Sequence, residues 1–216
     1  MQPVQIGNCT LYQGDSLEVL PHLPPVDTVM TDPVWSECPP VRLAGWDAPQ
    51  QLLQSALERI TTRRLVIVLR SDSDPRFLSA VPAALPFFRI QILPYVMPGY
   101  IGRKLGGDEM AYSFGEPIPV RPGFRVIGGY GPKVQPAERP RNGHPCSRSQ
   151  KHFNWLVECW SVEGETILDP FMGSGTTGVA CAVMGRKFIG CEIEPKYFDI
   201  ACKRIEDAYR QADLFI

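Results

Sequence analysis

The glycine-rich run at residues 169–178 limits the fold of this 216-residue chain more than any other part of the sequence. It reads Asp-Pro-Phe-Met-Gly-Ser-Gly-Thr-Thr-Gly, so Gly173, Gly175 and Gly178 satisfy the pattern G-x-G-x-x-G. β-Prone residues precede the run and a helical pattern of small residues follows it. Glycines at such a junction let the backbone approach a ligand, which the amides of the helix start then face. This context predicts a strand–loop–helix unit of a parallel sheet that carries a ligand site.

Apolar runs alternate with helical patterns along most of the chain. We expect strands at 10–12, 26–30, 65–69, 165–169 and 187–193, and helices at 16–23, 52–60, 150–160, 174–184 and 196–209. The continuous apolar run from Leu65 to Leu69 is typical of a strand buried on both faces. Two further strands, 87–96 and 109–114, are expected to pair antiparallel. The sequence therefore predicts a single α/β domain over residues 1–216, with a mostly parallel sheet and one antiparallel strand pair.

Three ligands compete for the glycine loop. A P-loop is excluded because Gly178 is followed by Val179 and not by lysine. A dinucleotide fits the glycine spacing, but the carboxylate of Asp169 at the strand end would repel its pyrophosphate. S-Adenosylmethionine carries an ammonium group and a ribose but no phosphate. Glu192 ends the next expected strand, where a carboxylate can accept hydrogen bonds from two ribose hydroxyls. The loop therefore favours S-adenosylmethionine.

A second motif, Asp32-Pro33-Val34-Trp35, follows the expected strand at 26–30, at the edge where open α/β sheets bind ligands. The exocyclic amine of a nucleobase is a poor nucleophile because its lone pair is delocalised into the ring. The carboxylate of Asp32 and the carbonyl of Pro33 can accept its two hydrogens and localise that pair toward a methyl donor. Trp35 can stack on a base rotated out of the duplex. Taken alone, the motif also fits a turn with an aspartate cap and a buried tryptophan.

Together these motifs resemble those of the β-class amino-methyltransferases of DNA. That family has a Rossmann-like, S-adenosylmethionine-dependent methyltransferase fold with a circularly permuted motif order, in which the catalytic tetrapeptide precedes the cofactor loop. The likeness covers most of the chain: residues 32–35 stand where the family has Asp-Pro-Pro-Tyr, 12–20 look like its opening segment, and 149–151 resemble its Thr-Gln-Lys. The resemblance implies that Asp32, Pro33 and Trp35 act on the base. It also implies cofactor binding by Asp15, Asp169, Phe171, Gly173, Ser174, Gly175, Thr176, Glu192 and Lys151, without a metal.

The chain departs from the family pattern at two places. Val34 replaces the second proline of the tetrapeptide, which loosens a rigid turn, and Trp35 replaces tyrosine. The carbonyl of Pro33 is retained, so we expect activity to survive. His144-Pro145 normally stands one residue before Gln-Lys, whereas here residues 146–149 intervene and His152 replaces the proline that follows. The floor of the cofactor pocket is therefore defined less well by the sequence than its glycine loop.

Basic residues are concentrated in one stretch of a chain whose net charge is −1. Residues 121–151 contain seven lysines and arginines and one acidic residue, Glu138. A solvated loop is the plain alternative, but in the resembling family this stretch holds the target-recognition region. We therefore expect an insertion at 115–148 that binds double-stranded DNA, and a homodimer, which is frequent in the family. The expected DNA contacts are Arg121, Arg125, Lys133, Arg139, Arg141 and Arg148, with Arg103 and Lys104 from a neighbouring loop.

The sequence thus predicts a DNA adenine N6-methyltransferase of the restriction–modification kind. Aspartate at the first tetrapeptide position favours adenine, because cytosine N4 enzymes of the family usually have serine there. A cytosine N4 enzyme, a methyltransferase of RNA or of a protein amide, a catalytically silent DNA-binding relative and a dinucleotide oxidoreductase stay open as alternatives. The seven cysteines and three histidines complete no zinc-ligand spacing. No signal peptide or membrane span is recognisable, so we expect a cytoplasmic protein.

Overall fold

The computed structural model describes residues 2–34, 44–45, 47–95, 108–118, 128–135, 143–144 and 147–213. In these ranges the helices are α1 (Ser16–Val19), α2 (Pro49–Leu57), α3 (Gln150–Trp160), α4 (Thr176–Val183) and α5 (Pro195–Asp213), with 3-10 turns at Leu20–His22 and Pro75–Ala80. The strands are β1 (Val4–Ile6), β2 (Cys9–Gln13), β3 (Val26–Thr31), β4 (Thr62–Arg70), β5 (Phe87–Leu93), β6 (Glu109–Gly115), β7 (Thr166–Asp169) and β8 (Lys187–Glu192). Within the described part of the chain, no helix combines the length and apolar character needed to cross a membrane.

The strands form one sheet in the order β1-β2-β8-β7-β3-β4-β6-β5. The run from β2 to β4 is parallel throughout. β6 lies antiparallel to both β4 and β5, and β1 lies antiparallel to β2. The mostly parallel sheet and the antiparallel pair are therefore confirmed. The short edge strand β1 was not predicted, because only Ile6 of its residues is buried and no alternating pattern marks it.

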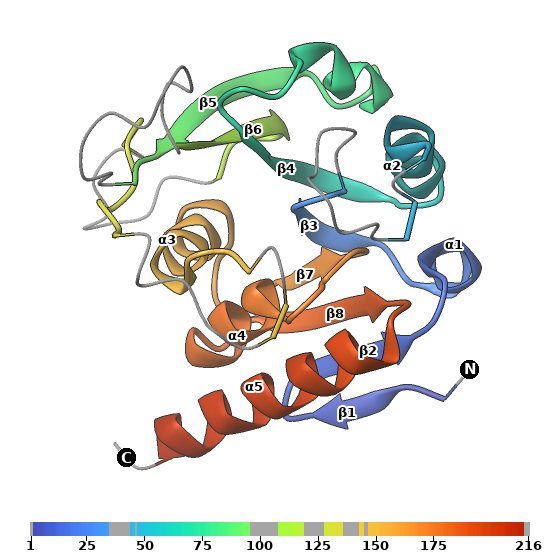
Figure 1. Cartoon of the computed structure of the whole chain (residues 1–216), viewed down its shortest axis with the longest axis vertical. Coiled ribbons are helices and arrows are strands. Elements are labelled where there is room, and N and C mark those ends of the chain that lie inside the picture. Colours follow the sequence, from blue (N-terminus) through green and yellow to red (C-terminus); the bar gives the residue numbers. More distant parts are fainter. Residues whose placement is uncertain are drawn as a thin grey trace.

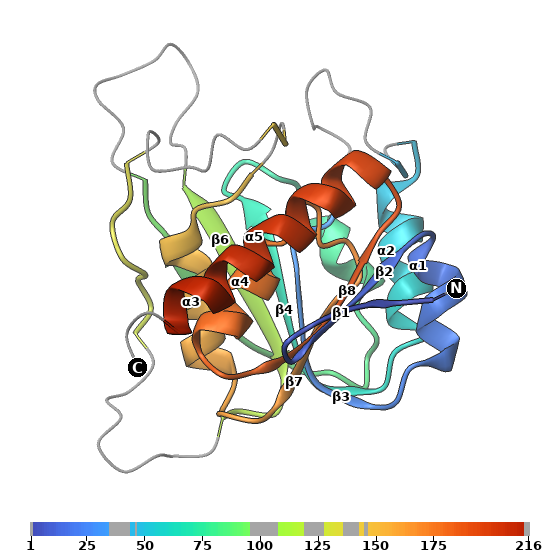
Figure 2. The same ribbon diagram turned by 90° about the horizontal axis from the view of Figure 1, so that it is seen from below.

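Helices cover both faces of the sheet (Figures 1 and 2). The central strand β4 divides its side chains between the two resulting cores. Val66 and Val68 pack in the core beneath α3, α4 and α5. Leu65, Ile67 and Leu69 pack in the core that includes the buried face of α2. This is the strand buried on both faces that its continuous apolar run predicts.

Two helix boundaries differ from the expected ones for local reasons. The helix expected at 16–23 is an α-helix only to Val19 and continues as a 3-10 turn that contains Pro21. Proline lacks an amide hydrogen and clashes with the preceding turn, so it cannot continue an α-helix. Helix α4 begins at Thr176 and not at 174, because Gly175 adopts a left-handed conformation with φ +76° and forms the cap.

The third glycine of the G-x-G-x-x-G pattern serves packing. Gly178 lies inside α4, and a Cβ there would lie 2.6 Å from the Cδ1 atom of Ile205 on α5 and 2.8 Å from the Cε1 atom of Phe188 on β8. Both distances are shorter than real carbon contacts, and the ring of Phe188 is itself fully buried. Gly178 therefore lets α4 lie close to the sheet and to α5.

Substitution of Gly178 by alanine is expected to destabilise the fold. Alanine favours a helix over glycine by about 1 kcal/mol, but overpacking of a tight core costs about 1–3 kcal/mol. We expect a net loss in the free energy of unfolding, measured by urea denaturation. Gly129→Ala is the matched control, because a Cβ at Gly129 meets nothing within 4 Å. An equal stability of the two variants would contradict the close packing.

Candidate active site

Acidic residues end or follow four neighbouring strands at one edge of the sheet. Asp169 ends β7, and Asp32 follows β3, the strand beside it. Glu192 ends β8 on the other side of β7, and Asp15 follows β2, whose last residue pairs with Glu192. Open α/β sheets bind ligands beyond the carboxyl ends of their strands, where the strand order reverses. The boundary between β7 and β3 is such a point.

A cavity of about 330 Å³ lies at this edge. Residues of both sequence motifs line it together with Asp15 and Glu192: Asp32, Pro33, Val34, Asp169, Phe171, Gly173, Ser174 and Thr176. Further lining residues were not predicted as cofactor or base contacts: His144, Ser147, Arg148, Glu194 and Tyr197. The volume is in the range of small-molecule sites in proteins. The structure therefore brings the glycine loop and the tetrapeptide to a single cavity.

Asp169 is almost completely buried, with 3% of its surface exposed. Its Oδ1 atom accepts a hydrogen bond from the amide of Phe171 at 3.2 Å, and its Oδ2 atom accepts one from the hydroxyl of Thr177 at 2.7 Å. Burial raises the pKa of Asp169 to about 7 although these bonds lower it, and the nearby charge of Asp32 raises it further. Near neutral pH this carboxyl therefore gains or loses its proton readily, and a cationic ligand would favour its charged form.

Glu192 connects the glycine loop to the end of β8. Its Oε2 atom accepts a hydrogen bond from the amide of Gly173 at 2.9 Å, and its Oε1 atom accepts one from the amide of Glu194 at 2.8 Å. Burial raises the pKa of Glu192, and the two amides oppose that shift. Each carboxylate oxygen has two lone pairs. The side chain is therefore held in place while it keeps acceptor capacity toward the cavity.

The glycine loop is supported from behind by two polar side chains. Arg204 of α5 donates to the carbonyl of Ser174 at 2.5 Å and to its hydroxyl at 3.0 Å. Its other terminal nitrogen donates to Gln150 of α3 at 2.9 Å, and Gln150 donates to the carbonyl of Thr176 at 3.0 Å. The sequence analysis missed Arg204, because a single arginine in an amphipathic helix has no local signal.

His144 closes the cavity over Gly173. Its Nε2 atom lies 3.1 Å from the position that a Cβ on Gly173 would take. The imidazole packs edge to face on Tyr197, with ring centroids 4.4 Å apart. Burial and the charges of Arg148 and Arg204 lower the pKa of His144 to about 4. The ring is therefore neutral at physiological pH.

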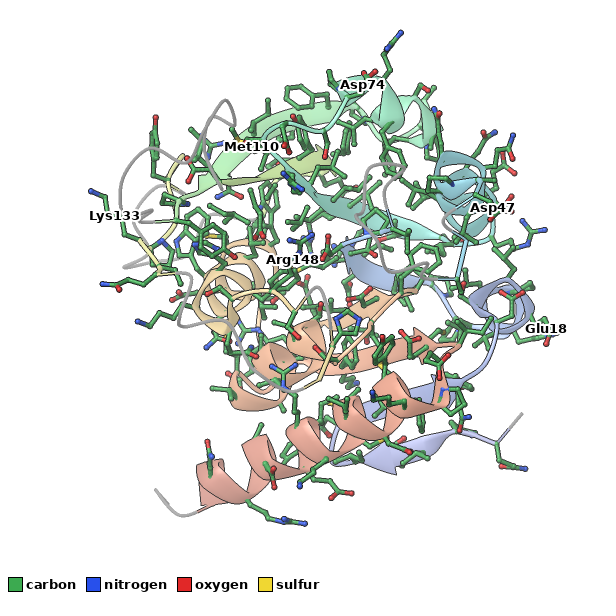
Figure 3. All side chains as sticks on the ribbon, in the orientation of Figure 1. Glu18, Asp47, Asp74, Met110, Lys133 and Arg148 are labelled. Atoms are coloured by element: carbon green, nitrogen blue, oxygen red, sulfur yellow. The ribbon has the colours of Figure 1, made fainter. Side chains whose placement is uncertain are left out.

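Arg148 differs from its predicted role as a DNA contact. Its side chain is 7% exposed and donates to both carboxylate oxygens of Asp32, with Nη2–Oδ1 at 2.9 Å and a second bond from Nε to Oδ2. Figure 3 shows Arg148 near the centre of the molecule and Lys133 at its periphery. The prediction that Arg148 contacts DNA from the surface is corrected, because its side chain is buried against Asp32 and a count of charges along a sequence does not reveal burial.

Two predicted cofactor contacts lie elsewhere. Lys151 is exposed on the first turn of α3 and is not among the residues that line the cavity. Gly175 faces α5, since a Cβ there would lie 2.8 Å from the Cβ of Ala201. Neither residue lines the cavity: Lys151 lies at the surface and Gly175 forms a packing turn. Several other predicted residues lie outside the described ranges: Trp35, Arg103, Lys104, Arg121, Arg125, Arg139 and Arg141.

Comparison with known proteins places this architecture in a family. Residues 42–203 match the sequence profile of the DNA methylase family. The chain belongs to the DNA methylase family.

Individual relatives agree with this membership. The chain is 40% identical over 76 residues to the Type II methyltransferase M2.DpnII of Streptococcus pneumoniae, which is 35% of this chain and 28% of that protein. It is 44% identical over 64 residues to the orphan methyltransferase M.BamHII of Bacillus amyloliquefaciens, which is 30% of this chain and 24% of that protein. The matches thus span only about a quarter of the length of these relatives.

Solved structures share the fold over nearly the whole chain. The crystal structure of the M1.HpyAVI–SAM complex superposes with a TM-score of 0.70 at 23% identity, over 91% of this chain and 98% of that one. The PvuII DNA methyltransferase, described as cytosine-N4-specific, superposes with a TM-score of 0.68 at 15% identity, over 96% and 93%. The predicted methyltransferase fold is therefore confirmed.

Substitution of Asp169 by asparagine is expected to raise the melting temperature relative to the wild type, increasingly so from pH 5 to pH 8. The folded-state pKa is about 7, whereas an unfolded aspartate titrates at about 3.9. The stabilisation that the bound proton confers is thus present at low pH and is lost as the pH rises through 7. Asparagine has no charge to desolvate and can still accept from the Phe171 amide.

Differential scanning calorimetry at both pH values measures this effect, since each kcal/mol shifts the melting temperature of a domain of this size by roughly 2–4 °C. A difference between variant and wild type that stays constant over this pH range would contradict the raised pKa.

Proposed function

We propose that this protein transfers a methyl group from S-adenosylmethionine to the exocyclic amine of a base in DNA, with adenine N6 as the acceptor. The observation that supports this most is the presence of Asp32 and Asp169, from the two motifs, in one cavity. Membership of the DNA methylase family supports methyl transfer to DNA. The choice of adenine over cytosine N4 is the finer part of the proposal. It rests on aspartate at position 32.

The charges of the cavity fit S-adenosylmethionine. Its described lining contains the acids Asp15, Asp32, Asp169, Glu192 and Glu194. Arg148 is the only lysine or arginine among those lining residues, and it is paired with Asp32. Such a lining favours a cationic ligand without phosphates and disfavours the pyrophosphate of a dinucleotide. When bound, S-adenosylmethionine would supply an electrophilic methyl group, whose bond to sulfur breaks as the N–C bond forms, so that S-adenosylhomocysteine leaves.

The protein's own residues prepare the acceptor amine. Asp32 and the carbonyl of Pro33 accept the two amine hydrogens, so that the nitrogen lone pair is localised for the new N–C bond. The amine then loses one proton, for which the Asp32 carboxylate is an acceptor. Acceleration comes from positioning and from preorganised acceptors, without a covalent enzyme intermediate. Within the described ranges, no group of three or more His, Cys, Asp and Glu side chains is arranged to hold a metal ion.

The proposal includes double-stranded DNA as the substrate and residues 115–148 as the region that recognises it. Lys133 is exposed there and available to phosphates. A homodimer is part of the same proposal, and sedimentation equilibrium with and without DNA measures it.

Methyl transfer is tested by incubation with labelled S-adenosylmethionine and unmethylated bacterial genomic DNA, followed by nucleoside mass spectrometry. We expect label in N6-methyladenine. Label in N4-methylcytosine would show that the proposed acceptor base, adenine, is wrong, and absence of label in every nucleoside would refute the proposed function.

Asp32→Asn should lower kcat at least about 100-fold, because it removes a preorganised acceptor, and should leave the affinity for S-adenosylhomocysteine unchanged. Loss of that affinity would place Asp32 in cofactor binding instead.

Substitution Glu192→Gln is expected to lower the affinity for S-adenosylhomocysteine by about 10–100-fold, since hydrogen bonds to a charged group contribute about 1.5–3 kcal/mol. Glutamine keeps one oxygen to accept from the Gly173 amide, so the loop should stay in place. Glu18→Gln is the matched control on an exposed residue of α1 outside the cavity. Isothermal titration calorimetry measures all three proteins. An unchanged affinity in the Glu192 variant would exclude its predicted contact with the ribose.

A further inference from the structure

Arg148 joins two carboxylates that come from different parts of the sheet. On one side it donates to both oxygens of Asp32, which follows β3. On the other side its Nη1 atom donates to Oε1 of Glu109 at 2.6 Å. Glu109 begins β6, and because β6 runs antiparallel to β4, this start lies at the same edge of the sheet. The side chains of Arg148 and Glu109 are 7% and 1% exposed, so this bridge is shielded from water.

Glu109 is itself held by buried aromatic residues. The hydroxyl of Tyr95 donates to its Oε2 atom at 3.0 Å. The Nδ1 atom of His152 on α3 lies 3.9 Å from the same oxygen. The rings of Tyr95 and His152 pack edge to face, with centroids 4.9 Å apart. Glu109 therefore anchors one nitrogen of Arg148, while the other two nitrogens donate to Asp32.

We propose that Arg148 is a positioning residue that orients the carboxylate of Asp32 toward the acceptor amine, and that Glu109 holds Arg148 in place for this task. The inference rests on the proposed function for the role of Asp32. A carboxylate has about four lone-pair sites, and the arginine occupies one on each oxygen. Paired hydrogen bonds from one planar guanidinium fix a carboxylate more firmly than a single donor does.

The electrostatics of the cavity give this pairing a second consequence. Asp169 on the neighbouring strand shows what burial does to an acid at this edge, because its pKa rises to about 7. Burial lowers the pKa of Arg148, but the charges of Asp32 and Glu109 raise it by more, so the guanidinium stays charged. Its charge in turn favours the anionic form of Asp32. The other titratable groups that line the cavity are Asp15, His144, Asp169, Cys191, Glu192, Glu194 and Tyr197.

The test compares kcat against pH for the wild type, Arg148→Gln and Arg148→Lys, with saturating DNA and S-adenosylmethionine. Removal of a paired cation raises the pKa of an aspartate by about 1–3 units. We therefore expect the pKa of Asp32 to rise by at least about one unit in Arg148→Gln, and the acidic limb of the profile, to which Asp169 also contributes, to move to higher pH. The KM for S-adenosylmethionine should change little. Arg148→Lys, which keeps the charge but loses the paired donors, should keep the limb and lose part of kcat. Added guanidinium ion should partly restore the glutamine variant.

Arg186→Gln is the matched control, because Arg186 is also buried and hydrogen-bonded but lies outside the cavity lining. It should lower the melting temperature without moving the acidic limb. Glu109→Gln should reproduce a weaker form of the Arg148→Gln shift.

Two results would overturn the proposal. An unchanged titration of the Asp32 carboxyl in Arg148→Gln would mean that Arg148 does not act through Asp32. A higher kcat would mean that the arginine blocks the amine site.

A titration of carbon-13-labelled side-chain carboxyls by NMR separates this inference from the proposed function. The Asp32 resonance is assigned from its loss in Asp32→Asn, and no turnover is needed. Its titration should move to higher pH in Arg148→Gln and not in Arg186→Gln. If the wild type transfers no methyl group but the Arg148→Gln variant shows this shift, the proposed function is refuted and the pairing of Arg148 with Asp32 stands. If the wild type transfers methyl groups but the Arg148→Gln variant shows no shift, only the pairing is refuted.

Discussion

The carboxyl edge of the parallel sheet brings several acidic side chains together around one partly buried cavity, where water stabilises their charges poorly. Four neighbouring strands each bring one acid there, in the order Asp15, Glu192, Asp169 and Asp32. Adjacent strands lie only about 4.8 Å apart, so the acids cannot be separated without a change of strand order. Because the acids are crowded, the cavity favours a cationic ligand. For the same reason, each acid needs a neighbouring group that stabilises its charge.

Each acid is stabilised by a different local device. Asp15 accepts the amide of Leu17 at 2.9 Å as the cap of α1. Glu192 accepts two backbone amides. Asp169 has one amide and one hydroxyl and keeps a raised pKa. Asp32 accepts hydrogen bonds from two nitrogens of the Arg148 guanidinium, whose third nitrogen donates to Glu109. Carboxylates at one sheet edge thus acquire separate properties, because their neighbours set the stability of each charge.

Local pattern was sufficient to predict most of the elements and the acids of the site. The strand–loop–helix unit around Gly173 and the aspartate after β3 each depend on residues close in sequence. Contacts between side chains far apart in the sequence could not be predicted from local pattern. Arg148 and Asp32 are 116 residues apart in the sequence. A run of basic residues predicts a DNA-binding surface, but it does not show whether one of those residues is buried. The place of Lys151 was beyond local pattern too: it lies on the first turn of α3, and the residue of that helix that lines the cavity is Phe153.

The segment before α3 connects the two halves of the candidate site. His144 lies over Gly173, the hydroxyl of Ser147 lies 3.4 Å from that of Ser174 on the glycine loop, and Arg148 reaches Asp32. Residues 146–149 stand where the family pattern has a single residue, and yet His144 still closes the cavity. Within this segment, Ser147 and Arg148 line the cavity beside His144. Val34 replaces the proline that stiffens this turn in the family pattern, and the proposed role of Arg148 gives Asp32 a side-chain partner that orients it where this proline is absent.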